Sequence, residues 1–208
     1  MSASRVETPP RLLIVPGLHG SGEDHWQSWL QQRYRGSRRV EQPDWAVPDL
    51  DGWAARIGEA IGDGPRDGRW IAVAHSFGCL ALLRHLQLRG AAAIDSAILA
   101  APADPRRFGV EDQALHRSPL RDGLVVASRN DPWMSFASAK AWTTCWDLAL
   151  LDAGEVGHIN PASGFGPWPL AEQLVQRRLQ RWAHEQPRNH SFPGARSVPS
   201  IGAVATPR

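Results

Sequence analysis

The sequence predicts an α/β fold in which a six-stranded parallel sheet is covered by helices on both faces. Short apolar runs alternate with longer amphipathic stretches along the 208 residues, which is the pattern of strands alternating with helices. The runs are rich in Val, Ile, Leu and Ala, as expected of strands that are buried on both faces. Parallel neighbours need a crossover connection, and the amphipathic stretches supply the helices that make it. The length is that of one domain.

Six apolar runs give the expected strands. The first is Arg11-Leu-Leu-Ile-Val-Pro16, which a Gly-rich loop follows. The second, Arg38-Arg-Val-Glu-Gln42, is weaker and ends at Pro43, because proline cannot donate a hydrogen bond to a sheet. The other four are more apolar and lie at residues 70–74, 96–101, 124–128 and 147–151.

Helices are expected where apolar residues recur at helical spacing. They cover residues 28–34, 49–61, 78–88, 135–144 and 170–184. Residues 62–68, which contain three glycines and a proline, form a turn region. The stretch between the strands at 96–101 and 124–128 is too short for a separate lid domain, so we expect none.

Composition places the chain among globular proteins. Residues are 42% hydrophobic and 21% charged, with a formal net charge of +2, which excludes a chain that stays unfolded for lack of apolar surface. Cys79 and Cys145 cannot form a disulfide framework, and residues 1–10 lack the apolar stretch of a secretory signal. No apolar run approaches the ~20 residues that cross a bilayer. We therefore expect a cytoplasmic protein without membrane contact.

The basic pI near 8.9 comes from the end of the chain. Residues 186–208 carry three arginines and no acid, so without them the net charge changes from +2 to −1. Elsewhere the arginines are interleaved with acids, which argues against a nucleic-acid partner. Four prolines and little apolar periodicity predict that residues 186–208 are a disordered tail. The expected organisation is an N-terminal extension at 1–10, one domain at 11–185 and this tail.

The clearest chemical motif is Ala74-His-Ser-Phe-Gly78, between the strand at 70–74 and the following helix. It matches the nucleophile-elbow pattern G-x-S-x-G, with alanine in the first glycine position, where it adds only a methyl group. A serine on such a turn projects its hydroxyl away from the sheet, which predicts Ser76 as a nucleophile. The alternative is that Ser76 only caps the helix, as serine often does.

A serine hydroxyl needs a base to take its proton. His158 follows the last expected strand, where the chain order Ser, acid, His places a base. The alternative for His158 is a loop histidine that makes an ordinary hydrogen bond. His75 is adjacent to Ser76, but neighbouring residues at such a turn point apart, so we expect His75 to pack beside the sheet.

A third group must orient the base, and this acid should follow a strand between the serine and the histidine. Asp131, in Ser128-Arg-Asn-Asp-Pro132, does so and is the leading candidate. Asp104, after the strand at 96–101, is the competitor, because an acid there can reach the same histidine. A turn-forming aspartate before proline is the alternative for both.

The oxyanion that forms when a carbonyl is attacked needs N–H donors. One is expected from the backbone after the nucleophile, at Phe77. The second should come from the loop after the first strand, Pro16-Gly-Leu-His-Gly20, where Gly17 allows a close approach of the backbone. Leu18 is the favoured donor in this loop and His19 is the second choice.

Neither a nucleotide cofactor nor a metal is expected. Gly17, Gly20 and Gly22 do not match G-x-G-x-x-G, and no suitably placed acid follows the second strand. The segment from His19 to His25, which contains two acids, matches no metal-ligand spacing.

With these residues identified, the chain resembles the α/β-hydrolase superfamily, and within it the small serine hydrolases related to retinoblastoma-binding protein 9 and the bacterial YdeN-like proteins. The resemblance covers residues 11–182 and rests on Pro16-Gly17, His25-Trp26, Ala74-His-Ser-Phe-Gly78, Asn130-Asp-Pro132, and Gly157-His-Ile-Asn160 with Ser163-Gly-Phe-Gly-Pro-Trp168. It implies a three-layer fold without the extra N-terminal strands of larger relatives, a triad of Ser76, Asp131 and His158, and carboxylesterase-like activity. Neither cysteine lies in the Leu-x-Cys-x-Glu motif of the animal member, so a retinoblastoma-type partner is not expected.

We therefore expect hydrolysis of small esters or amides through an acyl-Ser76 intermediate. The pocket should be open, because no lid is expected. Its rim is expected to consist of five residues in loops at strand ends, namely Leu18, His19, Phe77, Trp133 and Trp168; simple packing is the alternative for the aromatic residues. Two other functions stay open: a binding module without efficient chemistry, and a thioesterase, amidase or aminopeptidase on the same triad. Nothing in the sequence indicates an oligomeric state.

Overall fold

Six parallel strands form one sheet at the centre of the structure, a computed structural model that describes residues 9–62, 69–110, 115 and 117–185. The strands lie in the order β2-β1-β3-β4-β5-β6, so the chain steps from β1 out to β2, returns to β3 on the other side of β1 and then continues to β6. Their bounds are β1 Arg11–Val15, β2 Arg38–Arg39, β3 Trp70–Ser76, β4 Ile94–Pro102, β5 Gly123–Ala127 and β6 Ala149–Asp152.

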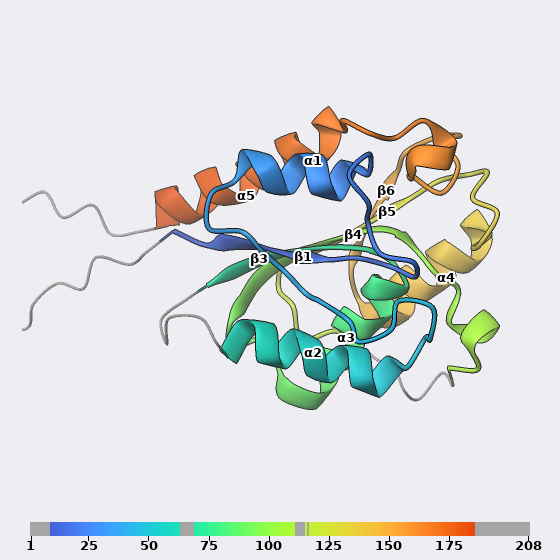
Figure 1. Ribbon diagram of the computed structural model, residues 1–208, viewed down its shortest axis with the longest axis horizontal. Helices are drawn as coiled ribbons and strands as arrows, with labels where there is room; N and C mark the ends of the chain where they lie inside the picture. Colours follow the sequence, from blue (N-terminus) through green and yellow to red (C-terminus); the bar gives the residue numbers. More distant parts are fainter. Residues whose placement is uncertain (1–8, 63–68, 111–114, 116, 186–208) are drawn as a thin grey trace, which may run out of the picture.

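Helices cover both faces of the sheet and give three layers (Figure 1). Helices α1 and α5 lie on one face, whereas α2, α3 and α4 lie on the other. Their bounds are α1 Trp26–Arg33, α2 Leu50–Gly62, α3 Phe77–Arg89, α4 Phe136–Trp146 and α5 Pro169–Glu185. This arrangement confirms the predicted fold class.

Each face of the sheet has its own apolar core, because successive strand side chains point to opposite faces. Toward α2 and α3, Leu13 and Ala72 pack in one cluster with Trp53. Toward α1 and α5, Ile14 packs in a second cluster with Trp26. Burial of both faces accounts for the almost continuous apolar sequence of the central strands. None of the helices in the described ranges has the length and apolar character needed to span a membrane.

The predicted strands and helices are present, with different ends. Helix α1 begins at Trp26, before the predicted residue 28, because the Nδ1 atom of His25 accepts a hydrogen bond from the Gln27 N–H and caps the helix. Strand β2 is shorter than predicted because it lies at the sheet edge and pairs with β1 alone. The predicted extension at 1–10, turn at 62–68 and tail at 186–208 lie mostly or wholly outside the described residues.

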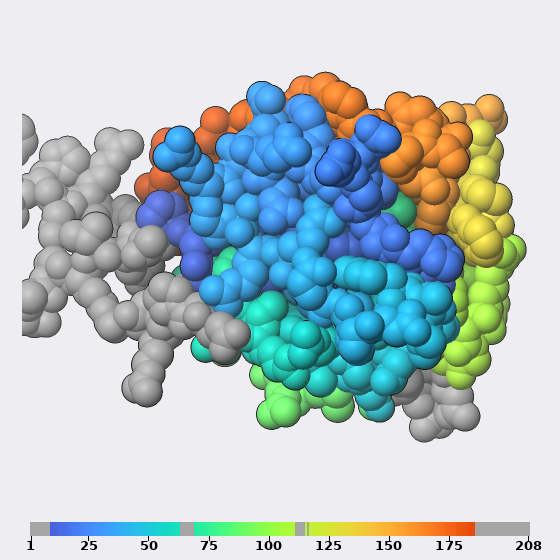
Figure 2. Space-filling view, viewed as in Figure 1, coloured from blue at the N-terminus to red at the C-terminus, as the bar shows by residue number. Residues whose placement is uncertain are grey.

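The loops that follow β1, β3, β5 and β6 lie at one edge of the sheet, because all the strands run in the same direction. In the space-filling view, the blue, yellow and orange segments after β1, β5 and β6 come together at the right-hand end of the molecule (Figure 2). Residues 103–122 connect β4 to β5 and begin with the short 3-10 helix η1, Pro105–Phe108. This connection is too short for a separate lid domain, as predicted.

Candidate active site

Ser76 lies at the sharp turn between β3 and α3. Its backbone has φ 51° and ψ −125°, a strained conformation for a residue other than glycine. Two glycines provide the space for this turn: a Cβ on Gly17 would lie 2.7 Å from the Cβ of Ser76, and one on Gly78 would clash with the carbonyl oxygen of Pro16. The Ser76 side chain makes no capping hydrogen bond, so the helix-cap alternative is wrong.

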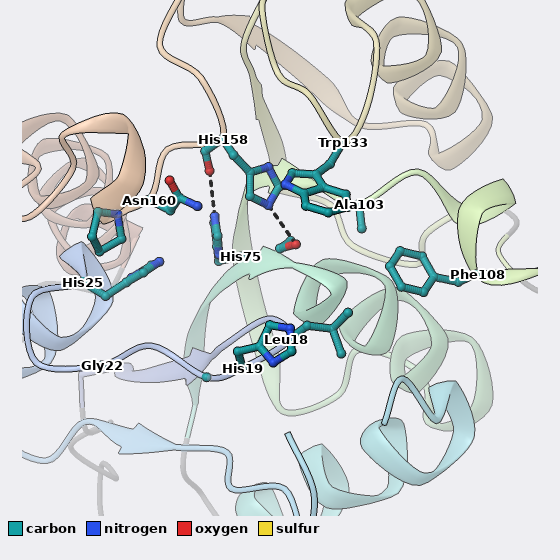
Figure 3. Close-up of a pocket in the computed structure, with 13 residues that line it drawn as sticks. Leu18, His19, Gly22, His25, His75, Ala103, Phe108, Trp133, His158 and Asn160 are labelled. Atoms are coloured by element: carbon teal, nitrogen blue, oxygen red, sulfur yellow. Dashed lines mark hydrogen bonds between the residues drawn. The ribbon is translucent and has the colours of Figure 1, made fainter. Parts of the chain in front are cut away.

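Ser76, His158 and Asp131 form one hydrogen-bonded row. The Oγ atom of Ser76 lies 2.9 Å from Nε2 of His158 (Figure 3), and Nδ1 of His158 lies 2.9 and 3.0 Å from the two carboxylate oxygens of Asp131. Because a carboxylate only accepts, Nδ1 carries the proton and Nε2 is left to accept from the Ser76 hydroxyl. Only 7% of the His158 side chain and 3% of the Asp131 side chain are exposed. The bond between His158 and Asp131 is therefore largely shielded from solvent.

Asp131, and not Asp104, is the carboxylate bonded to His158. Asp131 follows β5, which pairs with β6, the strand that precedes His158. It also accepts the backbone N–H of Trp133 at 2.8 Å, which fixes the orientation of the carboxylate. Asp104 instead caps η1, where it accepts the N–H of Arg106 at 3.1 Å.

The loop after β1 and the start of α3 hold the predicted oxyanion donors. Phe77 is the first residue of α3, and the first N–H groups of a helix have no partner within it. The His19 N–H donates to the carbonyl oxygen of Trp45 at 2.9 Å, which leaves the Leu18 N–H as the candidate in its loop. The close approach of Gly17 to the nucleophile places this loop directly beside Ser76.

The row opens into a pocket of about 340 Å³. On one side of the His158 ring the pocket is lined by the apolar side chains of Leu18, Ala103 and Phe108 and by Trp133 (Figure 3). On the other side it is lined by the polar side chains of His25, His75 and Asn160. The Trp133 side chain is 51% exposed, with the guanidinium of Arg107 5.5 Å from its ring centre. Leu18, His19 and Trp133 line the pocket as predicted. Phe77 does not, because its side chain is fully buried in the core.

Trp168 does not line the pocket, which corrects the prediction. It is 5% exposed and packs edge-to-face against Trp26, with 4.8 Å between ring centroids. Trp168 therefore belongs to the core between the sheet and helices α1 and α5. For Trp168, the alternative of simple packing is therefore correct.

Sequence reasoning missed several pocket residues. Ala103 and Phe108 lie in the β4–β5 connection, where no motif singles them out. His25 had a signal, because it belongs to one of the segments that carry the family resemblance. His75 was expected only to pack, and it is buried, but its Nε2–H also donates to the backbone carbonyl oxygen of His158 at 2.9 Å.

Two buried histidines beside the row are neutral at neutral pH. The pKa of His25 is lowered from 6.5 to about 4, mainly by burial and to a smaller extent by electrostatic repulsion from Arg39 and His158. Burial also holds the pKa of His75 well below its usual value of 6.5, with His25 and His158 acting in the same direction. Neither ring therefore adds charge to the pocket.

We expect the protein to lose stability as the pH falls from 6.5 toward 4. Unfolded His25 binds a proton near pH 6.5, whereas folded His25 binds one only near pH 4, so unfolding takes up a proton in this window and acid favours it. The loss from His25 is about 3 kcal/mol. His25→Asn, which keeps a capping oxygen, should remove this part of the pH dependence in urea unfolding curves. An unchanged dependence in this variant would rule out His25 as the cause.

Gly17→Ala is expected to slow the reaction of Ser76 with a fluorophosphonate, a reagent for activated serines, by roughly 100-fold. The added Cβ would lie 2.7 Å from the Cβ of Ser76 and 2.9 Å from the carbonyl oxygen of His75, so the loop and the elbow must move apart. Gly22→Ala in the same loop is the control, because nothing lies within 4 Å of its added Cβ. Equal labelling rates in the two variants would contradict this account.

Comparisons with known proteins agree with this geometry. The pattern of the serine hydrolase family matches residues 12–177. YdeN of Bacillus subtilis (strain 168) is 26% identical over 180 residues, which are 79% of this chain and 94% of YdeN. The crystal structure of a protein described as YdeN-like, from Pectobacterium atrosepticum, is 37% identical with a TM-score of 0.77 over 83% of this chain and 92% of that chain.

A more distant structure shares the fold. XC6422 of Xanthomonas campestris, described as an α/β serine hydrolase without a lid, is 17% identical with a TM-score of 0.62 over 89% of this chain and 88% of that chain. The family match spans most of the domain and includes the elbow and the His158 segment. The chain therefore belongs to the serine hydrolase family, among its YdeN-like α/β-hydrolase members.

Proposed function

We propose that this hydrolase cleaves small carboxylic esters or amides through an acyl-Ser76 intermediate. Ser76 is the nucleophile, His158 the general base and then general acid, and Asp131 the group that orients His158. The observation that carries the proposal is the row of hydrogen bonds at 2.9 Å from Ser76 Oγ to His158 Nε2 and from His158 Nδ1 to Asp131.

The reaction follows from the protonation states that the row imposes. Ser76 gives its proton to Nε2 of His158 as its oxygen attacks the carbonyl carbon, and the carbonyl electron pair moves to the oxygen. The N–H groups of Leu18 and Phe77 stabilise that oxyanion. The electron pair of the oxyanion then re-forms the carbonyl and the bond to the alcohol or amine breaks. His158 gives its proton to that leaving group, so an acyl-serine remains. Water attacks the acyl group in the same way, and the carboxylic acid and the free Ser76 are released.

The pocket supports a small substrate with an apolar part. Its volume of about 340 Å³ is near the lower end of the range for small-molecule sites, roughly 300–1,000 Å³. The apolar wall of Leu18, Ala103, Phe108 and Trp133 offers no side-chain hydrogen-bond donor to the space beside Ser76 except the Trp133 indole N–H. An alkyl or aryl group is therefore the favoured occupant of that side.

The row also favours an enzyme over a binding module. In this row, a buried carboxylate is hydrogen-bonded to a histidine, and the histidine is hydrogen-bonded to a serine on a strained turn. A cleft that only binds a ligand does not need such an arrangement. Thioesterase, amidase and aminopeptidase activities use the same row, so the substrate panel below separates them from the ester hydrolase.

The test is a panel of 4-nitrophenyl esters from acetyl to decanoyl, with matched thioesters and anilides, together with fluorophosphonate labelling of the purified chain. We expect stoichiometric labelling and the highest kcat/KM for short acyl esters. Faster turnover of the thioesters or anilides, relative to their uncatalysed rates, would move the assignment to a thioesterase or an amidase. No labelling and no turnover of any substrate would favour the binding module.

A further inference from the structure

His158 lies in an irregular segment after β6, residues 153–160, which we call the base loop. Its backbone is left-handed at Gly157, with φ 60°, and at Ile159, with φ 48°. A positive φ is a genuine outlier for a β-branched residue such as isoleucine, so contacts from outside the loop must hold it. Before His158, Ser128 and Asn130 hold the base loop, because their side-chain oxygens accept hydrogen bonds from the N–H groups of Val156 and Gly157.

Two buried side-chain donors hold the carbonyls on either side of the left-handed turn at Ile159. The Nε2–H of His75 donates to the carbonyl oxygen of His158 at 2.9 Å, and the Nε1–H of Trp26 donates to that of Ile159 at 2.8 Å. His75 is 5% exposed and Trp26 is fully buried. We call these two donors the carbonyl clamp.

Neighbouring rings fix the orientation of His75. Its ring centroid lies 4.8 Å from that of His25, 4.9 Å from that of His158 and 6.1 Å from that of Trp26. Nδ1 of His25 is itself bonded to the Gln27 N–H at the start of α1, so His25 cannot turn away to make space. The His75 donor is therefore held against the His158 carbonyl from several sides.

We propose that the carbonyl clamp positions His158 for its hydrogen bond to Ser76, and that His75 is a positioning residue of the active site. His75 directly precedes Ser76 on β3, so its bond ties the backbone of the base to the strand that carries the nucleophile. The two bonds are visible together, one from His75 to the His158 backbone and one from the His158 ring to Ser76 (Figure 3). This inference rests on the proposed function only for the roles of Ser76 and His158.

Loss of the His75 donor should act through the position of the His158 ring. Without it, the His158 carbonyl loses its partner, and only the Trp26 donor still holds the left-handed turn at Ile159. The ring moves with that backbone, and proton transfer from Ser76 is sensitive to a displacement of about 1 Å. Substrate binding in the apolar wall is untouched, so kcat falls while KM changes little.

The test compares two substitutions of His75 in the full chain. His75→Gln keeps an N–H donor at about the reach of the imidazole Nε2, whereas His75→Leu removes the donor and keeps the bulk. We expect the rate constant of fluorophosphonate labelling to fall roughly 10- to 100-fold in His75→Leu and to change by less than roughly threefold in His75→Gln. If His75→Leu does not fold, His75→Asn takes its place, because its shorter side chain cannot reach the carbonyl.

His85→Leu is the matched control. His85 is also buried, and its Nδ1–H donates to the carbonyl oxygen of Ala54 at 3.1 Å, between α3 and α2. His85→Leu therefore loses the same kind of bond away from the pocket. It should lower the melting temperature and leave the labelling rate unchanged, whereas a labelling loss equal to that of His75→Leu would overturn the positioning role.

A second readout does not depend on reactivity. The proton on Nδ1 of His158, bonded to Asp131, should give a sharp NMR resonance in the wild type and in His75→Gln, and a broadened or absent one in His75→Leu. The inference is overturned if His75→Leu labels at the wild-type rate and keeps this resonance, or if His75→Gln is as slow as His75→Leu. If the wild type is not labelled at all, the proposed function fails, and the resonance alone then decides whether the clamp holds His158.

Discussion

Ser76→Ala is expected to lower kcat for a short activated ester by roughly 10⁴-fold or more. The acyl intermediate needs the serine oxygen that now lies 2.9 Å from Nε2 of His158, and no other side chain takes its place in the row. Alanine keeps the Cβ that packs beside Gly17, so the elbow and the melting temperature should be preserved. Full turnover by Ser76→Ala would end the proposed mechanism.

The control for this experiment is another serine outside the pocket. Ser37 lies beyond the end of α1, where its Oγ–H donates to the carbonyl oxygen of Gln31. Ser37→Ala should therefore keep both turnover and one fluorophosphonate label per chain, whereas Ser76→Ala should lose both. Labelling that survives in Ser76→Ala would mean that the reagent reacts at a different residue.

The fold could be predicted from the sequence because the strands are buried on both faces. Burial leaves runs such as 11–15 and 70–74 almost wholly apolar, and this signal does not depend on any distant contact. Helix ends depend on single side chains and were less accurate. The start of α1 was missed because it is set by a hydrogen bond from the Gln27 N–H to the His25 ring, and histidine is not among the usual capping residues.

The candidate site was predictable where chemistry is tied to strand ends. Ser76 is the last residue of β3 and His158 lies in the loop after β6, so their placement came with the fold. Asp131 and Asp104 both follow strands as well, and only the pairing of β5 with β6 separates them. That neighbour relation is a property of the sheet and not of either local sequence.

Side-chain orientation was the part that the sequence could not provide. Trp133 and Trp168 both lie in strand-end loops, yet one is 51% exposed at the pocket and the other is 5% exposed in the core. The bond from His75 to the His158 carbonyl joins residues that are 83 positions apart. No local pattern marks such a contact, because it depends on how the loop after β6 turns back over β3.

Asp131→Asn is expected to lower kcat by roughly 10³- to 10⁴-fold with little change in KM. The Trp133 N–H donates to Oδ1 of Asp131 at 2.8 Å, so it requires the asparagine oxygen at that position. The asparagine NH₂ group then faces Nδ1 of His158, which must give up its proton and accept. The imidazole proton therefore moves to Nε2, where it points at Ser76 and prevents His158 from acting as a base.

Asp104→Asn is the matched control, since it removes the same charge from the other carboxylate that the sequence offered. Asparagine still caps η1 by accepting the Arg106 N–H, so stability and kcat should both stay near the wild-type values. A large loss in Asp104→Asn with none in Asp131→Asn would give the acid role to Asp104. Wild-type kcat in both variants would mean that His158 needs no carboxylate. Asp131 would then have no role in the proposed mechanism.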